Sequence, residues 1–219
     1  FRGVEAYLNY LEAYYLRNNK VDGKAKSYWD AVRNRAGITG NFQTTIDNTD
    51  MNKETDLAAH PGSYEVDATL YNIRRERRNE LMGEGMRMDD LIRWRAMDKV
   101  QNYVIEGFNL WDEAYLSELY YEKVEVNNVP TGEIKNLLIA DGSAKANVSS
   151  KTLSKYLRPY QKVQANNEVF NGYNWSKANY LYPIGVRELQ LASPNQDDAS
   201  ASVIYQNPYW PITSNSALE

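Results

Sequence analysis

The chain has 219 residues, of which 42% are hydrophobic and 25% charged, a composition typical of a globular protein. Its formal net charge of -4 offers no positive field for a phosphate backbone, so we expect no nucleic-acid partner. The absence of cysteine and the single histidine exclude disulfides, cysteine nucleophiles and metal sites built from several imidazoles, so we expect no cofactor and no metal.

Two helices are predicted at the start of the chain. Apolar side chains from Val4 to Tyr15 recur at helical spacing and predict a helix over residues 4–17. A second helix fits residues 24–36, with Gly37 as a left-handed cap. The resulting helix pair, residues 1–37, matches one tetratricopeptide-type unit in size, although no second copy follows at that period.

Residues 38–66 are predicted to form a long polar connection, either a functional loop or a solvated insertion. Its acidic residues lack the alternating register and the central glycine of a calcium-binding EF-hand loop. His60 precedes a proline in this connection, and no cysteine or serine elbow is present for it to activate. We therefore expect neither calcium binding nor a catalytic base here.

A second helix pair is predicted over residues 67–100, with helices at 67–82 and 86–100 joined by Gly83, Glu84 and Gly85. The remainder, 101–219, alternates turn residues with aromatics and is predicted to be rich in ordered loops. Within it, 121–126 and 133–140 are predicted to form a β-hairpin around a turn at 129–132, and 186–191 a short helix.

Residues 74–98 read RRERRNELMGEGMRMDDLIRWRAMD, in which seven arginines face six acids. An arginine cluster suits phosphate binding, but acids at helical spacing favour internal ion pairs such as Arg77 with Glu80, Arg87 with Asp90 and Asp89 with Arg93. We predict a structural ion-pair network made of Arg77, Glu80, Glu84, Arg87, Asp90 and Arg93.

Pairs of carboxylates also raise the possibility of a glycosidase, with Glu80 and Glu84 or Asp112 and Glu113 as acid and nucleophile. A catalytic acid has to hold its proton near neutral pH, whereas neighbouring guanidinium groups favour the ionised carboxylate. The arginines around Glu80 and Glu84 therefore favour structural pairing, and we expect no enzyme.

The segment RRERRNELMGEGMRMDDLIRW strongly resembles the arginine/glutamate helix pair of the SusD/RagB family of outer-membrane glycan-binding lipoproteins. Two further segments agree in order: VEAYLNYLEAYY with YWDAVRNRAGI resembles the family's preceding helix pair, and ANYLYPIGVRELQLASPNQ with YQNPYW resembles its C-terminal ending. Met82, Gly83, Met86 and Tyr209 depart from the usual pattern. The resemblance implies a mainly α, SusD-like fold: a tetratricopeptide-like scaffold of helical hairpins with long ordered loops and a small β-hairpin.

What the resemblance implies about function is non-catalytic binding of an oligosaccharide or other nutrient at the bacterial cell surface, for delivery to a TonB-dependent porin of the SusC type. It also implies an outer-membrane lipoprotein of which residues 1–219 are the C-terminal portion, with the signal peptide and lipid anchor outside this chain. The alternative is a helical adaptor that mainly docks the porin, while the sugar binds to a preceding part.

Aromatic side chains are the natural candidates for sugar contacts, since their faces stack on sugar rings. Tyr7, Tyr28, Trp29 and Trp94 lie on the inward faces of predicted helices and are expected to belong to the core. Four loop aromatics lie outside such helical faces and are the ligand-binding candidates: Trp111, Tyr115, Tyr173 and Trp175.

Overall fold

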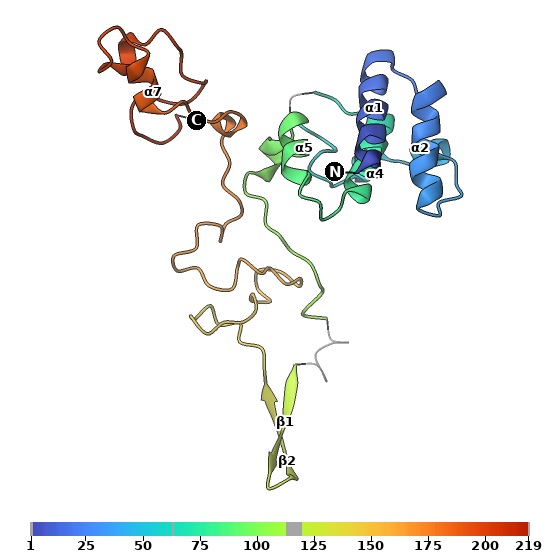
Figure 1. The fold of residues 1–219 in the computed structure, drawn as a ribbon. Helices are drawn as coiled ribbons and strands as arrows, with labels where there is room; N and C mark the ends of the chain where they lie inside the picture. The colour runs from blue at the N-terminus through green and yellow to red at the C-terminus, as the bar shows by residue number, and fades with distance from the viewer. Residues whose placement is uncertain (1, 63, 113–119, 219) are drawn as a thin grey trace. The chain divides into compact units, whose positions relative to one another are not determined.

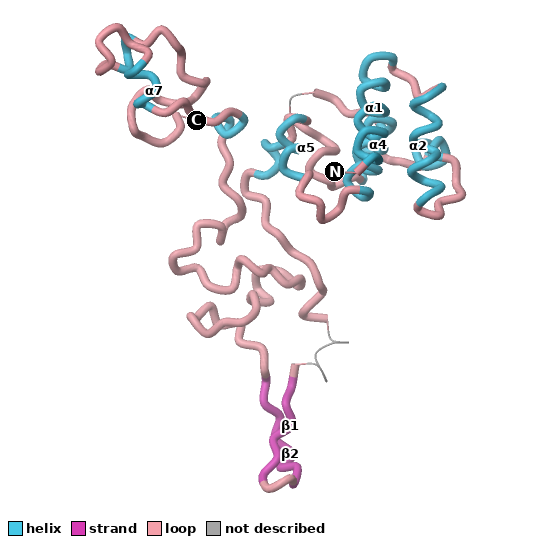
Figure 2. The backbone as a smooth tube through the Cα atoms, viewed as in Figure 1, coloured by secondary structure: helices cyan, strands magenta, loops and turns pink. Residues whose placement is uncertain are grey.

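The computed structural model of the chain describes residues 2–62, 64–112 and 120–218. These residues form two compact units. Unit 1 comprises Phe1–Lys99 together with Lys177–Glu219, and unit 2 comprises Val100–Ser176. Helices concentrate in unit 1, whereas loops make up most of unit 2 (Figure 2).

Unit 1 begins with an antiparallel helix pair, α1 (Gly3–Asn18) and α2 (Gly23–Arg35), which lie side by side (Figure 1). The left-handed residue Asn19, with φ 52°, ends α1. Gly37, with φ 74°, follows α2, and the N–H of Ile38 donates to the carbonyl oxygen of Arg33 at 2.9 Å. This 6→1 bond is the Schellman ending, so the predicted helix pair and its glycine cap are confirmed.

The core of unit 1 forms where α1 and α2 meet α4 (Ala68–Glu80), which packs against α1. Asp67 caps the start of α4 by accepting a hydrogen bond from the N–H of Leu70 at 2.8 Å. Trp29 of α2 is 1% exposed and stacks on Phe42 with 4.4 Å between ring centroids. The core cluster comprises Leu11, Tyr15, Ala25, Trp29, Phe42, Ile46, Ala59, Val66, Leu70, Tyr71 and Ile73.

The polar connection contains two helical turns that the sequence pattern did not predict, α3 (Phe42–Asp47) and the 3₁₀ turn η1 (Met51–Lys53). Asn41 caps α3 through a hydrogen bond from the N–H of Gln43 to Oδ1 at 2.9 Å. The apolar side chains of this helix are four residues apart, and one of them stacks on Trp29. A helix this short is stabilised by that tertiary packing rather than by a repeating pattern.

The second predicted helix pair is present, but its second helix is shorter than expected. Helix α5 spans Arg87–Arg93 and is followed by the 3₁₀ turn η2 (Met97–Val100), instead of one helix over residues 86–100. Arg95 adopts φ 53°, and the N–H of Ala96 donates to the carbonyl oxygen of Leu91 at 2.9 Å. A Schellman ending with arginine in the glycine position therefore stops the helix, and arginine gives no sequence signal for it.

Two of the rings expected in the core are there, since Trp29 and Trp94 are each 1% exposed. The expectation for Tyr7 is wrong, because its side chain is 40% exposed. It stacks on Tyr28 with 4.1 Å between ring centroids, and Tyr10 meets Tyr28 edge to face. The α1–α2 pair therefore presents tyrosine rings outward.

Unit 2 contains a two-stranded antiparallel sheet formed by β1 (Tyr121–Val126) and β2 (Val129–Asn136). The turn lies at Asn127 and Asn128, not at residues 129–132 as predicted. These asparagines have φ 51° and 64°, as a type I′ turn requires at both central positions. The segment that includes Pro130 and Gly132 belongs to the second strand instead.

Residues 177–219 of unit 1 contain the short helix α7 (Val186–Leu191), as predicted, and the 3₁₀ turns η3 (Lys177–Tyr180) and η4 (Ala199–Ala201). Trp210 Nε1 donates to the carbonyl oxygen of Leu181 at 2.7 Å and holds the segment together. The expected fold class, mainly helical with a small hairpin, is confirmed. Within the described ranges, every helix is too short or too polar to cross a membrane.

Candidate functional site

In unit 2, two antiparallel segments of the chain, the first and the second pass, carry the aromatic side chains of the candidate site. The first pass, residues 101–111, meets the second, 155–175, at several backbone hydrogen bonds. The N–H of Asn102 donates to the carbonyl oxygen of Tyr173 at 2.8 Å, and the N–H of Gly107 donates to that of Leu157 at 3.1 Å. Side chains reinforce the pairing, since Glu106 forms an ion pair with Arg158 at 2.7 Å.

Close approach of the two passes depends on Gly172. Its φ of +97° is unfavourable for any residue with a side chain. A Cβ atom there would also lie 2.4 Å from the carbonyl carbon of Asn102. The glycine therefore allows the backbone contact that places Tyr173 beside the first pass.

Three tyrosines gather around this contact, one from the first pass and two from the second. Tyr173 lies 6.3 Å from Tyr160 between ring centroids, with 59° between the planes. Burial raises the pKa of the Tyr173 hydroxyl above its ordinary value, and the neighbouring phenols of Tyr160 and Tyr103 raise it further. Because Tyr103 is 43% and Tyr160 46% exposed, ring faces and hydroxyls remain open to solvent.

A cavity of about 420 Å³ lies in the same unit and is lined mainly by polar groups. Its wall includes Gln161 and Lys162, which directly follow Tyr160 in the chain. Gln161 is buried and fixed, because Nε2 donates to the carbonyl oxygen of Phe170 at 2.6 Å and Oε1 accepts from Arg158 at 3.1 Å. The remaining lining residues are Ala140, Asp141, Gly142, Ser150, Thr152, Leu153, Gln164 and Phe170.

The carboxylate in this cavity is ionised at neutral pH. The backbone N–H of Ser143 and then its hydroxyl lower the pKa of Asp141 below the ordinary value. The cavity therefore offers a carboxylate, an ammonium group, amides and hydroxyls within one volume. Such a set donates and accepts hydrogen bonds in several directions, as the hydroxyl groups of a saccharide require.

Of the predicted ligand-binding residues, the three that the structure describes belong to unit 2, but they do not form one group. Tyr173 and Trp175 lie close together, and the N–H of Trp175 donates to Oε1 of Gln101 at 2.6 Å. Trp111 lies at the other end of the paired passes, where its N–H donates to the carbonyl oxygen of Lys155 at 3.2 Å. Tyr115 lies outside the described residues.

Sequence reasoning missed Tyr103, Tyr160 and the polar cavity. The two tyrosines lie 57 positions apart and meet only because the chain passes pair, which no local pattern reveals. The one available signal was composition, because Tyr160 is followed at once by Gln161 and Lys162. An aromatic ring next to amide and ammonium groups in a loop is a combination suited to sugar contacts.

The arginines of unit 1 form ion pairs that join different elements. Arg77 Nε contacts Oδ2 of Asp90 at 2.8 Å, and Arg93 Nε contacts Oδ1 of the same carboxylate at 2.8 Å. Glu80 is paired with both Arg2, at 2.6 Å, and Arg35. These pairs fix the positions of α1, α2, α4 and α5.

The partners differ from those expected at helical spacing. Arg87 pairs with Asp56 of the polar connection at 2.8 Å, not with Asp90, and Glu84 pairs with Arg2. Arg93 also contacts Oε2 of Glu12 at 2.7 Å. Most of the acids that pair with the arginines of residues 74–98 therefore lie elsewhere in the chain. The packing of the helices brings these acids within reach of the arginines.

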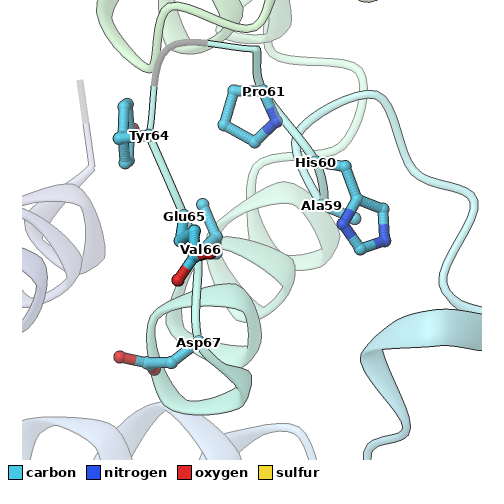
Figure 3. Close-up of a pocket in the computed structure, with 7 residues that line it drawn as sticks. All are labelled: Ala59, His60, Pro61, Tyr64, Glu65, Val66 and Asp67. Carbon is cyan, nitrogen blue, oxygen red and sulfur yellow. The ribbon is translucent and has the colours of Figure 1, made fainter.

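A second cavity, about 510 Å³, lies before the start of α4 (Figure 3). Two of its polar groups are engaged in structural bonds: His60 Nε2 donates to the carbonyl oxygen of Met51 at 2.8 Å, and Asp67 accepts from Tyr15 at 2.7 Å. Figure 3 shows the side chains of His60 and Asp67 pointing away from each other. Among the cavity residues that the structure describes, no base is aimed at a nucleophile. Within the described ranges, no cluster of ligating side chains fits a metal ion.

The comparisons with known proteins identify the family. The model of the SusD family matches residues 1–210. Searches of the curated proteins and of the solved structures gave no match. Because the family match extends over nearly all of the sequence, the chain belongs to the SusD family.

Proposed function

We propose that unit 2 binds a saccharide, without catalysis, through the polar cavity and the exposed tyrosines. Membership of the SusD family implies binding of a glycan or other nutrient at the outer membrane. The observation that carries the proposal for this site is the cavity of about 420 Å³ with its mixed polar wall, which falls within the size range of small-molecule sites. Tyr160, which precedes two wall residues in the chain, supplies an exposed ring for stacking.

The non-catalytic part of the proposal is supported by the arrangement of the carboxylates. Glu80 and Glu84, the pair that best suits a glycosidase by spacing, are both held in ion pairs with Arg2. Because the guanidinium of Arg2 occupies both carboxylates, neither is free to contact the leaving group of a substrate. The other pair considered, Asp112 and Glu113, includes a residue outside the described ranges.

Isothermal titration calorimetry against a panel of oligosaccharides tests this proposal. We expect saturable binding that is weakened by the double change Lys162→Ala and Gln164→Ala, because both side chains line the cavity. Lys123→Ala, an exposed position in β1, is the matched control and is expected to bind like the wild type. Loss of binding in the control alone, or the absence of any saccharide ligand for the folded protein, contradicts the proposal.

For the delivery step, we propose that the protein resides at the outer-membrane surface as a lipoprotein and passes its ligand to a TonB-dependent porin of the SusC type. One observation favours a docking role for the helix pair. Tyr7 and Tyr10 are 40% and 39% exposed, and the ammonium group of Lys24 lies 5.7 Å from the Tyr10 ring centroid. Exposed tyrosines are typical anchors of protein interfaces.

This second role is tested by co-purification with the porin. If the helix pair docks it, Tyr7→Ala combined with Tyr10→Ala reduces recovery of the porin while saccharide binding is unchanged. Tyr160→Ala serves as the reciprocal variant, which reduces saccharide binding and leaves porin recovery intact. Equal porin recovery with the wild type, the Tyr7 and Tyr10 double variant and Tyr160→Ala excludes docking through Tyr7 and Tyr10.

A further inference from the structure

The turn between α4 and α5 borders a cavity of about 250 Å³ in unit 1. Two glycines in this turn, Gly83 and Gly85, adopt φ of 79° and 80° and leave open space where a Cβ atom would stand. Two kinds of side chain line the cavity. The apolar ones are Leu81, Met82 and Met86, and the cationic ones are Arg77, Arg78 and Arg87.

Two of these arginines share one carboxylate. Arg78 and Arg87 both contact Oδ2 of Asp56, Arg87 at 2.8 Å, and the other oxygen, Oδ1, accepts from the N–H of Ala58 at 2.9 Å. Burial alone favours the neutral acid, but this N–H and the two guanidinium groups together lower the pKa of Asp56. One negative charge therefore faces two positive charges on this side of the cavity.

Behind the lining residues Arg77 and Asp90, a second network also holds more guanidinium groups than carboxylates. Asp90 is shared by Arg77 and Arg93, and Glu12 is shared by Arg93 and Arg74. Three guanidinium groups thus face two carboxylates, and Asp90 is the one carboxylate that lines the cavity among the described residues. Across both networks, five guanidinium groups are matched by three carboxylates.

The two guanidinium groups that share Asp56 are accessible to a ligand in the cavity. The side chains of Arg78 and Arg87 are 34% and 36% exposed, and within the described part of the chain each donates to Asp56 from one terminal nitrogen. A guanidinium group carries five N–H donors, so others remain for an anion in the cavity. Met82, which is 74% exposed, adds apolar surface at the same place.

From this juxtaposition we propose that the cavity binds a carboxylate attached to an apolar group, which pairs with Arg78 and Arg87 while its apolar part contacts Leu81, Met82 and Met86. The carboxylate group of an aliphatic acid and the C-terminal carboxylate of a peptide share this chemistry. A sugar without an acidic group fits less well, because it carries no charge to pair with the two guanidinium groups and its hydroxyls lose water against the apolar wall. The site is thus separate from the saccharide site proposed for unit 2.

Methyl NMR of methionine tests the proposal directly, because two of the five methionines line the cavity. We would titrate protein labelled at the methionine methyl groups with hexanoate and with N-acetylleucine. The Met82 and Met86 signals are expected to shift saturably at millimolar concentrations, while Met51, Met88 and Met97 serve as internal references. The neutral analogues, methyl hexanoate and N-acetylleucine amide, are expected to cause no saturable shift.

Removing one cation gives the decisive comparison. Arg87→Gln is expected to weaken carboxylate binding by about tenfold or more, as expected for the loss of a charge-assisted hydrogen bond. Arg17→Gln, an exposed position in α1, makes the same charge change away from the cavity and is expected to leave binding unchanged. If Met51 and Met97 signals show that Arg87→Gln has unfolded, Met82→Gln replaces it, and weaker binding is again expected.

The results of this titration distinguish an aliphatic acid from a peptide C-terminus as the ligand, and either of them from failure of the proposal. A saturable shift with N-acetylleucine alone assigns the site to peptide C-termini, and one with hexanoate assigns it to aliphatic acids. Equal shifts with the neutral analogues, equal weakening by Arg17→Gln, or no saturable shift with either acid overturns the proposal. None of these results bears on saccharide binding in unit 2, which the calorimetry measures separately.

Discussion

Trp94 Nε1 donates a hydrogen bond to Oε1 of Glu12 at 2.6 Å, although 82 positions separate the two residues in the chain. The same carboxylate pairs with Arg74 at 3.2 Å and with Arg93 at 2.7 Å. Glu12 is 3% exposed, and a charge at such depth is tolerated only because donors surround it. This one side chain therefore joins α1 to α4 and to the end of α5.

Replacement of Glu12 is the most damaging single change that we expect in unit 1. Glu12→Ala leaves the buried guanidinium of Arg74 and the indole N–H without their acceptor, and we expect the free energy of unfolding to fall by about 3 to 5 kcal/mol. Urea unfolding followed by circular dichroism measures this change. Glu84→Ala is the matched control, because Glu84 is 33% exposed in its pair with Arg2, and we expect a loss below about 1 kcal/mol. Equal losses of unfolding free energy in Glu12→Ala and Glu84→Ala refute the expectation that the buried carboxylate contributes more to stability than the exposed one.

Stability at alkaline pH depends on Tyr71. Its hydroxyl donates to Glu54 at 2.6 Å, and burial followed by this hydrogen bond raises the pKa of Tyr71 to about 12 from an ordinary value of 10.0. The folded chain then binds more protons than the unfolded chain between these values, so stability is retained below pH 10 and falls as the pH rises toward 12. The loss amounts to about 2 to 3 kcal/mol.

Tyr71→Phe isolates this contribution from the other tyrosines. We expect the variant to be less stable than the wild type at neutral pH and the difference to shrink as the pH increases from 10 to 12. Urea unfolding of both proteins across this range measures the difference. A difference that stays constant with pH rules out Tyr71 as its source.

The pairing of the two passes in unit 2 is tested at Gly172. Gly172→Ala introduces a Cβ atom 2.4 Å from the carbonyl carbon of Asn102 at φ +97°, and we expect a loss of more than about 1 kcal/mol. Amide hydrogen exchange of Asn102 and Tyr173 is expected to accelerate. Gly107→Ala is the control, since no atom lies within 4 Å of its added Cβ atom, and exchange at these two amides should stay slow.

Aromatic stacking in the proposed saccharide site is tested at Tyr160, which is 46% exposed. Tyr160→Ala removes the ring face and is expected to weaken saccharide binding by about three- to tenfold. Tyr160→Phe retains the face and is expected to recover most of the affinity. Calorimetry with the same oligosaccharide compares the variants, and identical affinity for Tyr160→Ala and the wild type excludes the ring from the site.

Local signals in the sequence predicted α1, α2, α4 and α7, but not α3 or the early end of α5. Gly37 marks the end of α2 because glycine adopts φ above zero without strain, and the short helix α7 begins and ends where expected. The same reasoning failed at Arg95, which occupies the glycine position of a helix ending without being glycine. Asn127 and Asn128 form the hairpin turn, although Pro130 and Gly132 gave the more familiar turn signal.

Local sequence signals do not predict contacts between residues that lie far apart in the chain. Arg77, Glu80 and Arg93 were recognised as members of an ion-pair network, yet the acids that hold the arginines include Glu12 and Asp56, which lie in other elements. The sequence does contain one indication that Glu12 is buried: it is a charged residue next to Leu11 on the inward face of α1. A charged residue in such a position predicts a buried partner without identifying it.

The long separation between Glu12 and its partners also sets an order for folding during protein synthesis. Helix α1 is translated before α4 and α5, but the arginines that neutralise its buried carboxylate and the indole N–H of Trp94 that binds it follow 62 to 82 positions later. Until they leave the ribosome, docking α1 onto its neighbours would bury an uncompensated charge. The nascent chain therefore has to keep α1 undocked until α4 and α5 have been made.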